Sequence, residues 1–150
     1  MKQIKSIHSI TKTIVDIMFS LGILCVVGVP LLVELMIKYF GYDSSLRIFL
    51  NIILVIAGVS AVYLLYNLRN MFRVMKKKNP FDERNIKSFS KMAISCAVIA
   101  VTFLVKCFVD FTVATFVIVV VFVVGSLFCL TLRDLFAQAA YYKEDHDFTI

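Results

Sequence analysis

The stretch RNMFRVMKKKNPFDERNIKSFSK, residues 69–91, lies between long hydrophobic runs and carries eight of the 16 Lys and Arg residues in the chain. Cytoplasmic loops of membrane proteins keep positive charge, whereas translocated loops are depleted of it. This basic loop is therefore predicted to be cytoplasmic. It divides the chain into two pairs of hydrophobic segments.

Composition points to a membrane protein. Hydrophobic residues make up 61% of the 150 residues and charged residues only 17%, which is too apolar for an ordinary soluble domain. Crossing a hydrocarbon core of ~30 Å takes roughly 20 helical residues. A soluble helical bundle, the alternative, would need polar stripes at a 3.6-residue period. The predicted fold is an all-α integral membrane protein, a single domain with four transmembrane helices at about residues 14–37, 48–68, 92–108 and 113–132.

The distribution of cations predicts the orientation. The N-terminus, the basic loop and the C-terminal segment together hold 13 Lys and Arg residues, whereas the two opposite connections hold only Lys38, Arg47 and Lys106. Both termini are therefore predicted to be cytoplasmic. Isoleucines on one face of residues 1–13 and lysines off that face predict a short interfacial helix before the first span.

The last two helices are predicted to extend into the cytoplasm. Asn79 suits a helix cap and Pro80 the first helical position, so the third helix is predicted to begin near Pro80. The fourth is predicted to continue past Arg133 to about Tyr142, followed by an acidic tail that completes residues 133–150. The short connection between the third and fourth spans predicts a tight hairpin.

Four ionisable residues lie near the ends of the spans: Asp16, Glu34, Lys106 and Asp110. An exporter that exchanges protons for a cationic substrate needs a carboxylate deep in the membrane. The two acidic residues of the first span are instead predicted near its ends, where Glu34 is placed to pair with Lys38 one turn later.

The sequence holds no motif for catalysis, with neither a Gly-rich phosphate loop nor a nucleophile motif. Metal sites need fixed geometry, and the acidic tail gives no sign of it. The four cysteines lie in predicted spans without a C-x-x-C pair, and they are predicted to pack as small apolar residues. We therefore expect no catalytic residue, no cofactor and no metal site.

The sequence leaves the role of the basic loop open. The positive charge of the loop is explained by membrane topology alone. It is equally explained by attraction to anionic lipid headgroups, which is worth about 1 kcal/mol per cation at the surface. Contact with nucleic acid is not expected of cations clustered beside a membrane. The loop and the acidic tail are also suited to docking a soluble protein. Small-residue faces in the second and third spans fit either self-association or packing within one bundle.

Two motifs carry a family resemblance. The first is Asn79-Pro80-Phe81-Asp82 followed by Asn85-Ile86, and the second is the tail with Leu135-Phe136, Tyr142-Lys143-Glu144-Asp145 and Asp147-Phe148-Thr149-Ile150. Together they resemble the YoaS-like bacterial membrane proteins, the family of domain of unknown function number twenty-nine seventy-five. The resemblance covers nearly the whole chain. It implies a four-span protein of the bacterial cytoplasmic membrane with no established enzymatic activity, commonly accompanied by a small Cro-repressor-like helix-turn-helix protein.

The favoured hypothesis is a non-enzymatic membrane protein that binds or modulates such a regulator through its cytoplasmic face. The predicted partner-binding residues are Arg73, Lys76, Lys77, Lys78, Asn79, Pro80, Phe81, Asp82, Asn85, Glu144, Asp145, Asp147 and Ile150. The alternative is a small transporter or an antimicrobial-peptide resistance (immunity) protein that acts in the bilayer. That alternative predicts that Asp16 or Glu34 faces an internal cavity.

Overall fold

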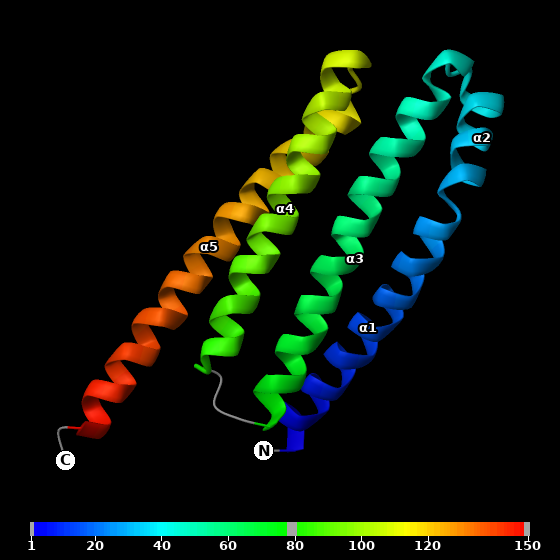
Figure 1. The fold of residues 1–150 in the computed structure, drawn as a ribbon. Helices are drawn as coiled ribbons and strands as arrows, with labels where there is room; N and C mark the ends of the chain where they lie inside the picture. Colours follow the sequence, from blue (N-terminus) through cyan, green and yellow to red (C-terminus); the bar gives the residue numbers. More distant parts are fainter. Residues whose placement is uncertain (1, 78–80, 149–150) are drawn as a thin grey trace.

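The computed structural model describes residues 2–77 and 81–148, with the side chains of residues 6–75 and 81–146. Short connections join its helices, which are α1 (Lys2–Val27), α2 (Val29–Phe40), the 3-10 helix η1 (Ser44–Leu46), α3 (Arg47–Lys77), α4 (Glu83–Val109) and α5 (Val113–Phe148) (Figure 1). Four segments are long and apolar enough to span a membrane, namely Ser6–Val27, Ser44–Met75, Glu83–Val109 and Val113–His146. The predicted all-α fold with four spanning helices is confirmed.

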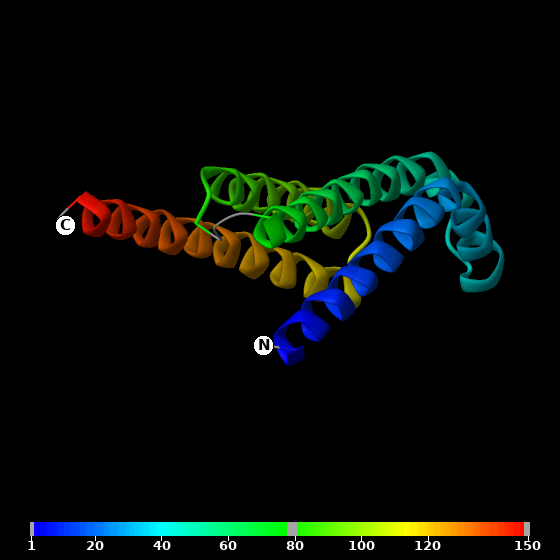
Figure 2. The same ribbon diagram turned by 90° about the horizontal axis from the view of Figure 1, so that it is seen from below.

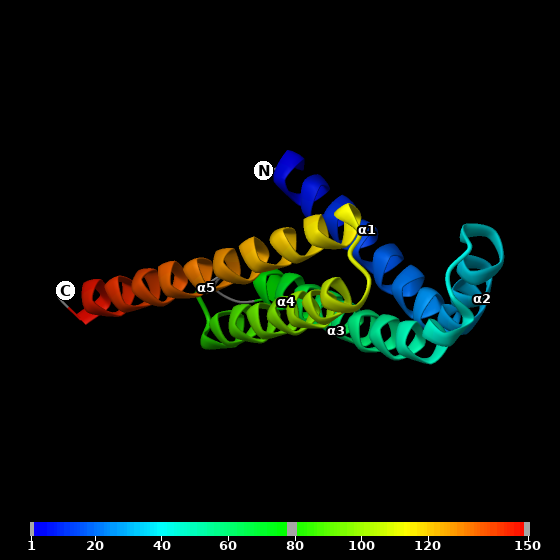
Figure 3. The same cartoon turned by 90° about the horizontal axis from the view of Figure 1, so that it is seen from above.

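The long helices pack in the order in which they occur in the chain. α1 packs on α3, α3 on α4, and α4 on α5, and the α4–α5 interface is the most extensive. Seen from above, α1 and α5 lie on the same side of the α3–α4 pair (Figure 3). Within the described part of the chain these two outer helices share no interface of comparable extent. The row of helices is therefore not closed into a ring.

Both termini lie at one end of the molecule, together with the C-terminal end of α3 and the N-terminal end of α4 (Figure 1). The connection that contains η1 lies at the opposite end. This arrangement matches the predicted grouping of the termini with the basic loop. The assignment of that end to the cytoplasm stays a prediction from the distribution of cations.

The first predicted span is divided at Gly28. α1 ends at Val27, α2 begins at Val29, and Pro30 lies in the first turn of α2. A proline lacks a backbone N–H and its ring clashes with the preceding turn, so the helix bends here and α2 turns away from α1 (Figure 2). At its other end α1 runs back without a break to Lys2. The first residues therefore continue the spanning helix rather than form the separate interfacial helix predicted for 1–13, because neither Gly nor Pro interrupts them.

α4 begins at Glu83, three residues later than Pro80, so its predicted start was wrong. Asp82 is the N-cap, and its Oδ1 accepts a hydrogen bond from the Arg84 backbone N–H at 3.3 Å. The Glu83 carboxylate in the first turn favours the positive end of the helix dipole. Asn and Asp cap helices equally well, so the sequence alone could not choose between Asn79 and Asp82. Asn79 and Pro80 lie outside the described residues.

Polar side chains inside the helices find partners within the protein. The hydroxyls of Ser20 and Thr102 donate to the carbonyl four residues earlier, at 3.1 and 2.7 Å. Ser126 instead donates across the α4–α5 interface to the carbonyl of Ala93 at 2.9 Å. An unsatisfied polar group in hydrocarbon costs several kcal/mol, so these bonds make the polar residues compatible with a membrane.

Glycines set the distance between α1 and α3. A Cβ placed on Gly58 would lie 2.7 Å from Cγ2 of Val26, and one on Gly22 would lie 3.3 Å from Cγ2 of Val62. Helices in lipid associate largely by van der Waals packing, which small residues improve by letting the backbones approach. The α1–α3 interface therefore depends on the absence of a side chain at Gly58.

Replacing Gly58 by Ala is expected to lower the melting temperature in detergent relative to Gly125→Ala. Overpacking costs about 1–3 kcal/mol, whereas a Cβ on Gly125 would meet its nearest neighbour, Cys96 Sγ, at an ordinary 3.8 Å. Both substitutions gain about the same helix propensity, ~1 kcal/mol, so the difference between the two variants isolates the clash. Equal melting temperatures would contradict the close α1–α3 contact.

Orientation is tested by thiol labelling in a background in which Cys25, Cys96, Cys107 and Cys129 are replaced by Ala. Ser45 in η1 and Gln138 in α5 are both exposed and lie on opposite sides of the predicted spans. We expect a membrane-impermeant maleimide to label Ser45→Cys in intact cells and Gln138→Cys only after permeabilisation. The reverse pattern would overturn the cytoplasmic assignment of the termini.

Candidate functional site

An ion pair joins α1 to α3 near the end that carries the termini. Asp16 Oδ1 lies 2.6 Å from Arg69 Nε, and the two side chains are 33% and 35% exposed. The angles of this contact fall outside those of a hydrogen bond. The Arg69 guanidinium also lies 5.5 Å from the centre of the Phe19 ring, which in turn contacts Tyr66. Asp16, which the sequence placed alone at the end of a span, therefore has its partner on another helix.

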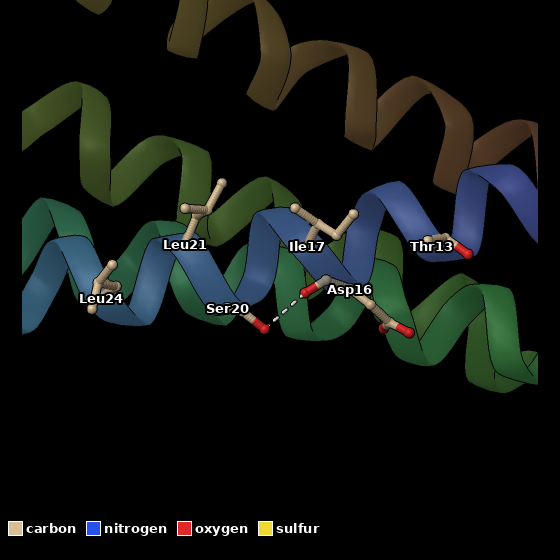
Figure 4. Close-up of a pocket in the computed structure, with 6 residues that line it drawn as sticks. All are labelled: Thr13, Asp16, Ile17, Ser20, Leu21 and Leu24. Carbon is tan, nitrogen blue, oxygen red and sulfur yellow. Dashed lines mark hydrogen bonds between the residues drawn. The ribbon is translucent and has the colours of Figure 1, made fainter.

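The hollow around Asp16 is a feature of the surface. Ser20 Oγ donates to the Asp16 backbone carbonyl, and the Asp16 carboxylate points to the opposite side of α1 from Ile17 and Leu21 (Figure 4). All of its lining residues belong to α1, namely Thr13, Asp16, Ile17, Ser20, Leu21 and Leu24. Glu34 on α2 is exposed. The described residues therefore place neither carboxylate in the internal cavity that the transport hypothesis predicted.

The predicted pairing of Glu34 with Lys38 is wrong. The two side chains are exposed and form no ion pair within the described structure. The Lys38 ammonium instead lies 5.8 Å from the centre of the Tyr39 ring. Exposed pairs at this spacing are worth only a few tenths of a kcal/mol, so a neighbouring aromatic ring competes readily.

Lys106 connects three elements at the end opposite the termini. Lys106 is only 9% exposed. The ammonium donates to Thr115 Oγ1 on α5 at 3.2 Å and to Asp110 Oδ2 at 3.4 Å, and it lies 5.9 Å from the centre of the Tyr42 ring. α4 ends at Val109 and α5 begins at Val113, which confirms the predicted tight hairpin. The contacts with Thr115 and Tyr42 were not foreseen.

Three aromatic rings hold together the two segments that the sequence motifs had singled out. The ring centres of Phe81 and Phe136 are 5.7 Å apart, and those of Phe89 and Phe136 are 5.0 Å apart. Tilted aromatic pairs at such distances contribute about 0.5–1.5 kcal/mol beyond the area they bury. The connection before α4, α4 itself and α5 are thus joined at one point, which we call the phenylalanine cluster.

The predicted partner-binding residues differ in accessibility. Arg73 is exposed on α3, whereas Asn85 is only 1% exposed and packs inside the protein. Lys76 and Lys77 end α3, and Asp147 lies in the last turn of α5, but their side chains lie outside the described part. The remaining predicted residues that fall outside the described chain are Lys78, Asn79, Pro80 and Ile150.

α5 continues well beyond the start of α4 (Figure 2). After Phe136 it runs on through Phe148, a further length of about 18 Å at 1.5 Å per residue. We call residues 137–148 the α5 extension. The sequence predicted this helix only to about Tyr142, but neither Gly nor Pro stops it there.

The α5 extension presents aromatic and acidic side chains. Tyr141 and Tyr142 are 68% and 70% exposed, with ring centres 6.2 Å apart in an edge-on arrangement. Glu144, Asp145 and His146 are also exposed. Among the described residues no three His, Cys, Asp or Glu side chains come together in a way that could hold a metal ion. The described surface of the α5 extension thus consists of exposed tyrosine, carboxylate and imidazole side chains.

A family model described as Protein of unknown function (DUF2975) matches residues 38–150. The chain belongs to the DUF2975 family. The match includes all of α3, α4 and α5, and with them the phenylalanine cluster and the α5 extension. The family resemblance predicted from the sequence motifs is thereby confirmed. Comparisons with curated proteins and with solved structures found no match.

A double-mutant cycle with Asp16→Asn and Arg69→Gln is expected to give a coupling free energy of about 1 kcal/mol. Exposed ion pairs contribute about 0–1 kcal/mol, whereas breaking a fully buried pair costs about 3–5 kcal/mol, and this pair is half-buried. The coupling is measured by unfolding in detergent. The Arg133–Asp134 pair, between adjacent residues of one helix with side chains 37% and 61% exposed, is the control and should give less coupling. Equal coupling in both cycles would contradict a stabilising role for Asp16.

Proposed function

We propose that this DUF2975 protein is a non-enzymatic membrane protein whose α5 extension binds a small cytoplasmic helix-turn-helix regulator. The observation that supports the proposal is the α5 extension itself. It is an exposed helix with acidic and aromatic side chains that projects past the helices on which α5 packs (Figure 2).

The side chains of the α5 extension suit a protein partner that carries positive charge. Tyrosines are enriched at protein interfaces, because they bury a large apolar area and keep a polar group. The Glu144 carboxylate favours a basic surface, and DNA-binding proteins carry such surfaces. A regulator bound here through its DNA-contacting face would be kept off DNA.

The position of the extension supports the same proposal. The phenylalanine cluster fixes its base to α4 and to the connection before α4. Basic residues of this end, such as Arg73, attract anionic headgroups, whereas the acidic tip is repelled by them. The extension is about 18 Å long, which exceeds the Debye length of about 8 Å at physiological salt. Its tip therefore lies where a soluble protein can reach it.

The tagged full-length chain, purified from native membranes in mild detergent, is expected to carry a small helix-turn-helix protein at near-equal amount. Deleting residues 143–150 should abolish this recovery without affecting membrane insertion. Glu144→Lys should reduce it about tenfold, the equivalent of 1.4 kcal/mol. Glu34→Lys is the matched control, an exposed carboxylate at the other end of the molecule, and should change nothing.

Recovery of the chain alone, or equal recovery with the two charge variants, would refute the proposal. The favoured hypothesis would then be a transporter or a peptide-resistance protein. For that alternative, combining Asp16→Asn with Glu34→Gln should remove any drug or peptide tolerance that the wild type confers.

A further inference from the structure

A second hollow lies between the helices. It has a volume of about 360 Å³ and is lined by residues of α1, α2, α3, α4 and α5, with no charged side chain among them. Its lining includes Gly22 of α1, Gly58 and Ala61 of α3, Phe103 of α4 and Ile118 of α5. The hollow exists because α1 and α5 do not close against one another. We call it the apolar groove.

Lys106 lies at one end of the apolar groove. It follows Phe103 by three residues on α4, and Thr115 precedes Ile118 by three residues on α5, so each polar residue continues a helix face that lines the groove. The hydrogen bond between Lys106 and Thr115 shows that these two faces meet. Tyr42, near the ammonium, packs against the cluster of Val29, Val33 and Leu50, and Val29 also lines the groove.

The Lys106 ammonium has capacity for a further acceptor. It carries three N–H donors. Thr115 accepts one of them at 3.2 Å, and Asp110 lies at 3.4 Å, longer than the 2.7–2.9 Å that is usual for such charged pairs. The Asp110 side chain is 31% exposed and that of Lys106 only 11%. The Lys106 ammonium is thus buried more deeply than the Asp110 carboxylate. A second anion beside it would stabilise the buried positive charge.

The size of the apolar groove distinguishes between its candidate occupants. One turn of a helix is 5.4 Å long and about 10 Å across with side chains, which amounts to about 400 Å³. A helix of a second copy would need several such turns and does not fit. An engineered apolar cavity of about 150 Å³ holds benzene, so about 360 Å³ has room for a segment of a flexible hydrocarbon chain, the rest of which can lie along the open side of the groove. The bilayer supplies such chains, each joined to a phosphate at the level of the interface.

We propose that the apolar groove binds a phospholipid. One acyl chain lies between Gly22, Gly58, Phe103 and Ile118, and the phosphate accepts a hydrogen bond from the Lys106 ammonium. The chain occupies the space that the open row of helices leaves, and the phosphate adds a third acceptor to Thr115 and Asp110, to which the Lys106 ammonium already donates. This site lies at the opposite end of α5 from the α5 extension, so it does not depend on the proposed regulator.

The phosphate contact is tested by native mass spectrometry of the purified chain with phosphatidylglycerol. Wild type is expected to retain one phospholipid per chain, and Lys106→Met at least tenfold less. Lys38→Met is the matched control, because Lys38 is an exposed cation of the same end whose ammonium lies near Tyr39 rather than beside Thr115 and Tyr42. Lys38→Met and Lys106→Arg should both retain phosphatidylglycerol as wild type does. A diacylglycerol of equal chain length, which has no phosphate, should not be retained. Equal retention by Lys106→Met and wild type would overturn the proposal.

A second experiment tests the acyl-chain contact and leaves Lys106 unchanged. It therefore tests the proposal even if Lys106→Met does not fold. Ala61→Phe fills the groove and should lower phosphatidylglycerol retention at least tenfold. A phosphatidylglycerol with a photoreactive acyl chain should crosslink mainly to groove residues such as Phe103 and Ile118. Equal crosslinking to the exposed residues Val101 and Val120 would show ordinary bilayer contact only and would refute the site.

Discussion

Lipid is as apolar as the helix faces of this protein, so burying hydrocarbon gives the helices little reason to associate within a membrane. Close approach and a few polar contacts must hold them together. For α4 and α5, a long interface and the Ser126 hydrogen bond to Ala93 supply both. α1 has a smaller interface and depends on the close approach at Gly58 and on the Asp16–Arg69 pair. The open row of helices follows from this difference, because α1 is held from one side only.

The charged residues of the two ends of the molecule are arranged differently. At the end with the termini, Arg73 and the tyrosine and acidic side chains at positions 141–145 of the α5 extension are exposed. At the other end Lys106 is buried among helix α5, the hairpin and the Tyr42 ring. Burying a charge is costly unless hydrogen bonds compensate it. Lys106 therefore belongs to the packing of the helices, whereas Glu144 and His146 of the α5 extension are exposed.

The sequence predicted what depends on local pattern. Hydrophobic length located the four spans, and the short connection after Lys106 located the hairpin. Contacts between residues far apart in sequence leave no periodic pattern, so the sequence did not predict that Asp16 pairs with Arg69. The contact between Phe81 and Phe136 was missed for the same reason, although both residues belong to the motifs that carry the family resemblance. The start of α4 was misplaced because Asn79 and Asp82 stand three residues apart and are equally suited to capping, so the sequence alone does not choose between them.

α1 lies outside the matched region, which begins at Lys38, yet it completes structures within that region. Arg69 on α3 would be a half-buried cation without Asp16, and such a charge is destabilising without a counter-ion. Gly22 and Val26 of α1, together with Val29 and Leu32 of α2, line the apolar groove from outside the match, and the rest of its lining comes from α3, α4 and α5. α1 is therefore part of the same folding unit as α3, α4 and α5. It is also the helix that makes a face of α3 one side of the apolar groove.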